Sequence, residues 1–228
     1  VAMARSLVVV LSLFTLARAA PPLLNNMFVA NITNSIAGVE MIGTYSSDHK
    51  REGPWPADPR VGDNDNHQFL FSGDFTKTFK VPLQQLVKCS ASHGGELYDD
   101  LGTHCRCKHR SAPECTNTPF FFPSDAVKSG EEEVNGYNCT LWSFENKSPR
   151  YSETTAVTQL PSGDFVAVRA DIKLLDVNII FSFSNIQIVS HFDNTTFAVP
   201  TACPACPTDE VGTNATVVLH GFEFPISL

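Results

Sequence analysis

Apolar and polar side chains alternate one by one along much of the chain, which is the period of a β-strand with one buried face. The clearest case covers residues 166–183. Apolar side chains occupy the even positions of 166–174 and the odd positions of 177–183, and the phase changes at Leu175 and Asp176. Two alternating runs joined by a short break with a change of phase predict an antiparallel hairpin.

The same alternation predicts further strands at 28–32, 69–81, 186–192 and 217–224. Within the second of these, Ser72-Gly73-Asp74 has the composition of a turn. Helical periodicity is weak, and only 81–89 could hold one or two turns of helix. Residues 53–68 are polar and rich in proline, which predicts a surface loop.

These elements predict a mostly β fold class in a single domain, residues 20–228, with one or two short helices. The chain holds seventeen phenylalanines, many of them on the inward parity of the predicted strands. An antiparallel sheet with one apolar face must cover that face with a second sheet or curl around a cavity. The pattern leaves both solutions open.

Residues 1–19 have the three-part layout of a secretory signal peptide. Arg5 gives a basic start, 6–16 form an apolar run, and 17–19 fit a small-x-small cleavage site. The apolar run is about half as long as the roughly twenty residues that span a bilayer. We therefore expect a protein that is secreted to the extracellular space or the lysosomal lumen, with no stable membrane insertion.

Charge argues against nucleic acid as a partner. The chain has a formal net charge of −8, and loss of Arg5 and Arg18 with the signal peptide leaves 14 basic against 24 acidic side chains, a charge of −10. Such a chain repels phosphate, and it contains no basic run.

Export also predicts glycosylation, and five Asn-x-Ser/Thr sequons are present. The candidate acceptors are Asn31, Asn138, Asn146, Asn194 and Asn214. A signal peptide and an excess of sequons are unrelated features that agree on the exported route. We expect these asparagines on exposed loops or strand edges.

In an oxidising compartment, cysteines at close spacing usually form disulfides. The seven candidates are Cys89, Cys105, Cys107, Cys115, Cys139, Cys203 and Cys206. Cys105 and Cys107 are too close to pair easily with each other, so we expect them to bond two different partners. An odd number leaves one thiol free or bonded to another chain, as in a homodimer.

Two other interpretations of these cysteines are weaker. A zinc site would use His104, Cys105, Cys107, His109 and Cys115, but the paired C-x2-C units of structural zinc sites are missing. The sequence Cys203-Pro-Ala-Cys206 resembles a thiol oxidoreductase motif. Such motifs begin a helix, whereas prolines surround this one and no helical pattern follows.

No nucleophile elbow, H-E-x-x-H motif or phosphate-binding glycine loop is present, so catalytic residues are not expected. Asp99, Asp100 and Asp125 could serve a hydrolase, although adjacent aspartates after Tyr98 are more typical of a turn. Asp63 and Asp65 are candidate calcium ligands, but they lack the glycine and glutamate of an EF-hand loop.

Several landmarks together resemble the ependymins and ependymin-related proteins. In order, they are Cys89, Tyr98-Asp99, Cys115, Pro123-x-Asp125-Ala126, Trp142, Tyr151-Ser152-Glu153-Thr154 and the block 181–203, which ends in Phe197-x-x-Pro200-x-x-Cys203. The resemblance covers about Cys89 to Cys203, and the last block is its most specific part. The chain departs from the family in adding Cys105 and Cys107 and in extending past Cys203.

The resemblance implies a non-catalytic glycoprotein with two curved antiparallel sheets packed around an apolar pocket, similar to the bacterial lipoprotein-carrier fold. It also implies a hydrophobic ligand, an association with calcium and a disulfide between Cys89 and Cys203. Candidate pocket-lining residues are Phe69, Phe71, Phe79, Trp142, Val168, Ile172, Phe181 and Phe183. Trp142 has a second interpretation, as core packing against a disulfide of Cys139.

The leading hypothesis from the sequence is a secreted carrier of a lipid or another hydrophobic small molecule. An extracellular adhesion module without a small ligand is the first alternative, with 53–68 and the glycans as its surface. A secreted hydrolase using the three aspartates is the second.

Overall fold

The computed structural model describes residues 20–22, 24–36, 39–49, 66–75, 82–90, 94–102, 104–110, 126–146, 151–206, 216–219 and 222–225. Its strands are β1 Asn26–Ile36, β2 Val39–His49, β3 Asn66–Phe75, β4 Pro82–Ser90, β5 Gly94–Asp100, β6 Cys105–Arg110, β7 Val127–Val134, β8 Tyr137–Asn146, β9 Tyr151–Gln159, β10 Phe165–Leu174, β11 Val177–Ile188, β12 Thr216–Leu219 and β13 Phe222–Pro225. The predicted signal peptide lies outside these residues, as do Asp63, Asp65, Phe79, Cys115, Asp125 and Asn214.

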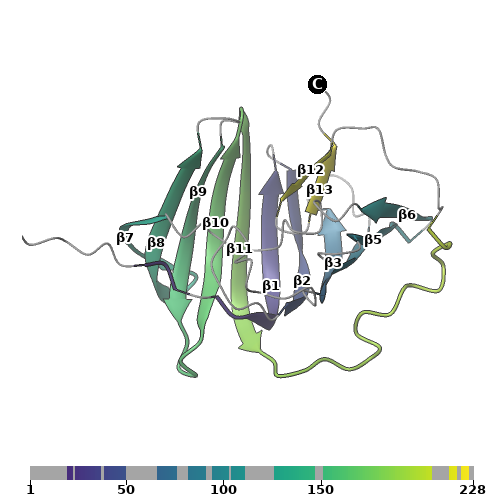
Figure 1. The fold of residues 1–228 in the computed structure, drawn as a ribbon, viewed down its shortest axis with the longest axis horizontal. Coiled ribbons are helices and arrows are strands. Elements are labelled where there is room, and N and C mark those ends of the chain that lie inside the picture. The colour runs from purple at the N-terminus through teal and green to yellow at the C-terminus, as the bar shows by residue number, and fades with distance from the viewer. Residues whose placement is uncertain are drawn as a thin grey trace, which may run out of the picture.

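Eleven of the strands form one open antiparallel sheet, and β12 and β13 pair separately (Figure 1). The order is β6-β5-β4-β3-β2-β1-β11-β10-β9-β8-β7. Each half of the chain is thus a meander, and the two meanders join where β1 pairs with β11. The mostly β fold class is confirmed. The described strands form one curved sheet with a small two-stranded ribbon rather than two packed sheets of similar size.

The hairpin predicted at 166–183 is confirmed as β10 and β11, with Leu175 at a positive φ of 54° in the turn. The described residues contain no helix, and the one predicted at 81–89 is instead strand β4. Adjacent Leu86 and Val87 are both buried because both faces of β4 are covered, and this hides the period of two. None of the described residues forms a helix able to span a bilayer.

One face of the sheet, named here the inner face, carries Phe28, Tyr45, Phe71, Phe181 and Phe183, none of them more than 1% exposed. Three of these rings form a cluster from β1, β2 and β11. The Phe183 ring centroid lies 5.7 Å from that of Phe28 and 5.6 Å from that of Tyr45. The opposite, outer face of the same strands carries polar side chains such as Thr33 and Ser182.

The backbones of β2 and β3 approach each other closely at two facing glycines. Gly43 and Gly73 face each other, and a Cβ atom added to Gly43 would lie 2.7 Å from the Cα of Gly73. This explains why Ser72-Gly73-Asp74 lies within β3 instead of forming the predicted turn. The glycine is needed for close packing of two strands, a role that its turn-like neighbours do not reveal.

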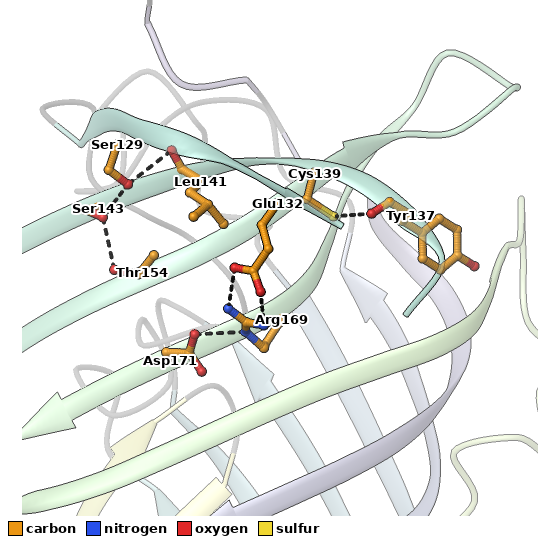
Figure 2. Close-up of polar contacts among 9 residues, drawn as sticks. All are labelled: Ser129, Glu132, Tyr137, Cys139, Leu141, Ser143, Thr154, Arg169 and Asp171. Carbon is orange, nitrogen blue, oxygen red and sulfur yellow. Dashed lines mark hydrogen bonds and ion pairs between the residues drawn. The ribbon is translucent and has the colours of Figure 1, made fainter. Parts of the chain in front are cut away.

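The hairpin of β7 and β8 is fastened to the outer face by polar contacts (Figure 2). The guanidinium of Arg169 on β10 donates two hydrogen bonds to the Glu132 carboxylate, at 3.0 and 2.9 Å, and a third to Asp171 at 2.8 Å. The described pairing of β10 with β11 ends at Arg169 and Ser182. Next to this point, the Asn135 amide donates a hydrogen bond to the carbonyl of Phe183 at 2.7 Å. The hairpin therefore holds the two strands together where their own ladder ends.

A segment after β11 covers the outer face of β4 to β6. Phe197 packs against Leu86 and Tyr98, and its ring lies 5.0 Å from that of Phe192. Two disulfides, Cys105–Cys203 and Cys107–Cys206, bond this segment to β6. Cys105 and Cys107 share one face of the edge strand, because residues two apart in a strand point the same way.

The structure answers most of the questions about the cysteines. Cys105 and Cys107 have two different partners, as predicted, and a structural role for Cys203 and Cys206 is confirmed. The zinc interpretation is wrong because two of its ligands are in disulfides. The implied Cys89–Cys203 bridge is also wrong, since Cys203 is bonded to Cys105, one of the cysteines that departs from the family pattern.

Cys139 is the free thiol among the described cysteines. It is 3% exposed, burial raises its pKa, and it donates a hydrogen bond to the carbonyl of Tyr137 at 3.5 Å (Figure 2). This burial disfavours a covalent dimer through Cys139. The Cys139 thiol is unpaired, so the interpretation of Trp142 as packing on a disulfide of Cys139 is wrong.

Candidate functional site: the inner face and its cavity

A cavity of about 600 Å³ lies at one end of the sheet, where β8, β9 and β10 meet residues 20–22. Its lining combines rings and aliphatic groups with amides and hydroxyls: Ala20, Pro22, Gly136, Tyr137, Asn138, Thr140, Trp142, Val157, Thr158, Gln159 and Phe165. The entering segment is fixed by the Asn25 backbone N–H, which donates to the carbonyl of Phe165 at 2.7 Å. Such a volume is within the range of small-molecule sites.

The structure brings one predicted lining residue, Trp142, to this cavity. The buried residues Phe71, Ile172, Phe181 and Phe183 lie elsewhere on the inner face. Val168 is buried at the β-bulge of β10, between the register positions of Ala167 and Arg169. Phe69 is in β3, but its side chain is outside the described part.

Sequence reasoning missed Val157, Gln159 and Phe165 on the cavity wall. Their alternation is visible in the sequence, but nothing in it says that Gln159 pairs with Phe165 or that Thr140 pairs with Val157. Cross-strand register alone brings them together.

Three polar groups on β9 interrupt the apolar inner face. Glu153 is 3% exposed, and its carboxylate accepts hydrogen bonds from the hydroxyls of Tyr151 and Thr155, the latter at 2.7 Å. Burial, with the neighbouring charge of Glu153, raises the pKa of the Tyr151 phenol far above its usual range, so the phenol stays a donor. Thr155 pairs with Trp142 of the cavity wall, so these three polar residues lie on the strand next to that part of the wall.

A half-buried carboxyl, that of Asp99, lies at the other end of the sheet. Burial raises the pKa of Asp99, although the Gln85 amide donates to it at 2.8 Å and the positive charges of Arg106 and Lys108 oppose the effect. The folded protein therefore holds the Asp99 proton more tightly than the unfolded chain does. The stabilising contribution of the Asp99 carboxyl is fully present below the ordinary pKa of an aspartate. It is lost as pH rises through the raised pKa of Asp99 in the folded protein.

Asp99→Asn is accordingly expected to raise the urea midpoint at neutral pH and to remove this loss of stability with rising pH. An asparagine keeps the oxygen that accepts from Gln85 and carries no charge to bury. Urea midpoints across the acid range for the wild type, Asp99→Asn and the exposed control Glu145→Gln measure the effect. A midpoint for Asp99→Asn that follows the wild type at every pH would contradict the burial argument.

The structure describes two of the hydrolase candidates, Asp99 and Asp100, and these do not form a pair. Asp99 and Asp100 are consecutive in β5, so their side chains point to opposite faces. Asp100 accepts a hydrogen bond from the backbone of Gly102 at 2.8 Å, as in a turn. Glu96, His109 and Cys206 lie close enough for a metal, but the Cys206 sulfur is in a disulfide and offers no thiolate.

The described sequon asparagines are exposed. Asn31 lies on the outer face of β1, Asn138 lies at the cavity, and Asn194 follows β11. Asn146 ends β8, and its side chain is outside the described part. Their exposure is as expected, although Asn31 lies in the middle of the interior strand β1 rather than on a loop or strand edge, and glycosylation itself stays a prediction.

No family model and no curated protein matches this chain, so the resemblance to ependymins stays a prediction. Among solved structures, a DUF1329 family protein from Desulfovibrio piger is 11% identical, with 75% of this chain and 89% of that chain covered at a TM-score of 0.44. The lipoprotein LppX of Mycobacterium tuberculosis is 13% identical (72% and 89% covered, TM-score 0.38). LprF from Mycobacterium bovis is 9% identical (74% and 89% covered, TM-score 0.36). Such distant likeness says nothing of ligand or activity.

Proposed function

We propose that this protein binds a hydrophobic or amphiphilic small molecule against the inner face of its curved sheet. One observation carries the proposal: an aromatic, buried sheet face meets a cavity of about 600 Å³ at Trp142. Removing apolar ligand surface from water there contributes about 25 cal/mol per Å². The mixed lining favours an amphiphile, since Asn138 and Gln159 stand beside Tyr137 and Phe165.

The proposal includes export and a binding role without catalysis. Disulfides persist in oxidising compartments, so the two bridges to β6 support a secreted or lysosomal location. The separated faces of Asp99 and Asp100 support a non-catalytic role. Mass spectrometry of the exported protein would test both glycans and a copurified ligand.

Gln159→Trp is expected to weaken ligand binding about tenfold, which corresponds to about 1.4 kcal/mol. The indole would occupy space in the cavity, whose wall includes Gln159. The measurement is fluorescence polarisation of a fatty-acyl probe titrated with delipidated protein. Gln187→Trp is the matched control, because Gln187 is exposed on the outer face of β11.

Saturable binding that falls with Gln159→Trp and survives Gln187→Trp supports the proposal. If the wild type binds none of several probe classes (acyl, sterol, isoprenoid), the ligand-binding function is wrong. If both variants bind like the wild type, the ligand does not use this cavity.

A further inference from the structure

Asn34 is a polar residue in a place that the fold alone does not explain. It lies on the inner face of β1 and is completely buried. Neither its amide nitrogen nor its amide oxygen has a hydrogen-bond partner among the described residues. Buried side-chain amides normally have partners, because an unmet donor or acceptor costs about 1–3 kcal/mol.

The side chains around Asn34 cannot satisfy it. Ile32 and Ile36 flank it along β1, Met41 faces it from β2 and Phe181 faces it from β11. All four are apolar, so no counter-charge is present among these neighbours. A leucine or valine would fill the position without leaving polar atoms unmatched, so the asparagine points to a polar partner that is not among the described residues.

Asn34 lies in the same cross-strand row as the cavity wall. From β8 to β1 the paired residues are Trp142, Thr155, Ala170, Phe181 and Asn34. The short side chains of Thr155 and Ala170 separate the two large rings of this row. Within this row, Trp142 lines the cavity, whereas Thr155, Ala170, Phe181 and Asn34 are completely buried in the ligand-free structure. A chain-like molecule that enters beside Trp142 must therefore open the packing over this row to reach the Asn34 amide.

We propose that Asn34 binds the polar head of the ligand and selects a neutral amphiphile whose head group carries a hydroxyl or an amide. This rests on the proposed function and adds the chemical class. The Asn34 amide needs both an acceptor for its N–H and a donor for its oxygen, and a hydroxyl or amide offers both. An ionised carboxylate offers no donor and would lose its hydration beside Ile32, Ile36 and Phe181 without a positive partner.

The test is displacement of a bound fluorescent acyl probe by four competitors of equal chain length: oleyl alcohol, oleamide, ionised oleate at alkaline pH, and a hydrocarbon. The wild type is expected to bind the alcohol and the amide about tenfold more tightly than the other two. Asn34→Leu is expected to abolish that preference while still binding the hydrocarbon. Asn178→Leu, at an exposed position of β11, is expected to keep it.

The free protein provides a second readout. Removal of an unmatched buried amide should raise the unfolding midpoint of ligand-free Asn34→Leu above that of the wild type. Asn34→Val gives the same comparison with a smaller side chain if leucine does not fit. An unchanged head-group preference in a folded Asn34 variant overturns the assignment and leaves the binding function standing. Absence of binding by the wild type removes both.

Discussion

Gly43→Ala is expected to destabilise the protein by about 4 kcal/mol or more, or to prevent folding. The new Cβ would lie 2.3 Å from the carbonyl oxygen of Ser72 and 2.7 Å from the Cα of Gly73. Both are backbone atoms of β3, so no side-chain rotation relieves the overlap. The strands would have to separate where they face each other most closely.

Chemical denaturation followed by circular dichroism measures this effect. Gly130→Ala is the control, since a Cβ there would meet only the Leu141 side chain, at an ordinary 3.7 Å. We expect Gly130→Ala to unfold within about 1 kcal/mol of the wild type. Equal midpoints for Gly43→Ala and Gly130→Ala would show that β2 and β3 do not approach as described.

Loss of both disulfides to β6 is expected to cost far more than loss of either one. The bridges span 98 and 99 residues, so the first to form closes a large loop and contributes about 4.7 kcal/mol of chain entropy. The second then closes only a short ring through β6 and 203–206, worth about 2 kcal/mol on the same model. Either bridge alone is therefore enough to close the large loop.

The variants are Cys105→Ser with Cys203→Ser, Cys107→Ser with Cys206→Ser, and all four together. Urea unfolding without reductant should give losses of about 2 kcal/mol for each pair and about 7 kcal/mol for the set. That total is comparable to the whole free energy of unfolding of many domains, which is about 5–15 kcal/mol. Equal losses for one pair and for all four would refute the shared-loop argument.

Local alternation was enough to predict the strands whose two faces differ. The β10–β11 hairpin follows from the change of phase at Leu175, and the fold class follows from many such runs. It failed at β4, where adjacent Leu86 and Val87 are buried on opposite faces and interrupt the alternation of apolar and polar residues. A strand covered on both sides carries no period of two.

The site was less predictable than the fold. Trp142 was identified as an inward residue, and it does line the cavity. Asn34 drew no attention because it lies beyond the strand predicted at 28–32, whereas β1 extends to Ile36. Its burial is visible only when Phe181 and Met41 are known to face it.

The sequence by itself determined that the chain folds into antiparallel strands with a phenylalanine-rich face, because period and composition are properties of neighbouring residues. Apart from the β10–β11 hairpin, only the tertiary structure decided which strands pair. Ser-Gly-Asp-Phe shows the difference: at 162–165 it forms a turn with Gly163 at a φ of 93°, whereas at 72–75 it lies inside β3 against Gly43. Cys203 likewise bonds Cys105 because the segment after β11 crosses β6. Contacts between residues a hundred positions apart depend on how the whole sheet is ordered, and no local pattern encodes that order.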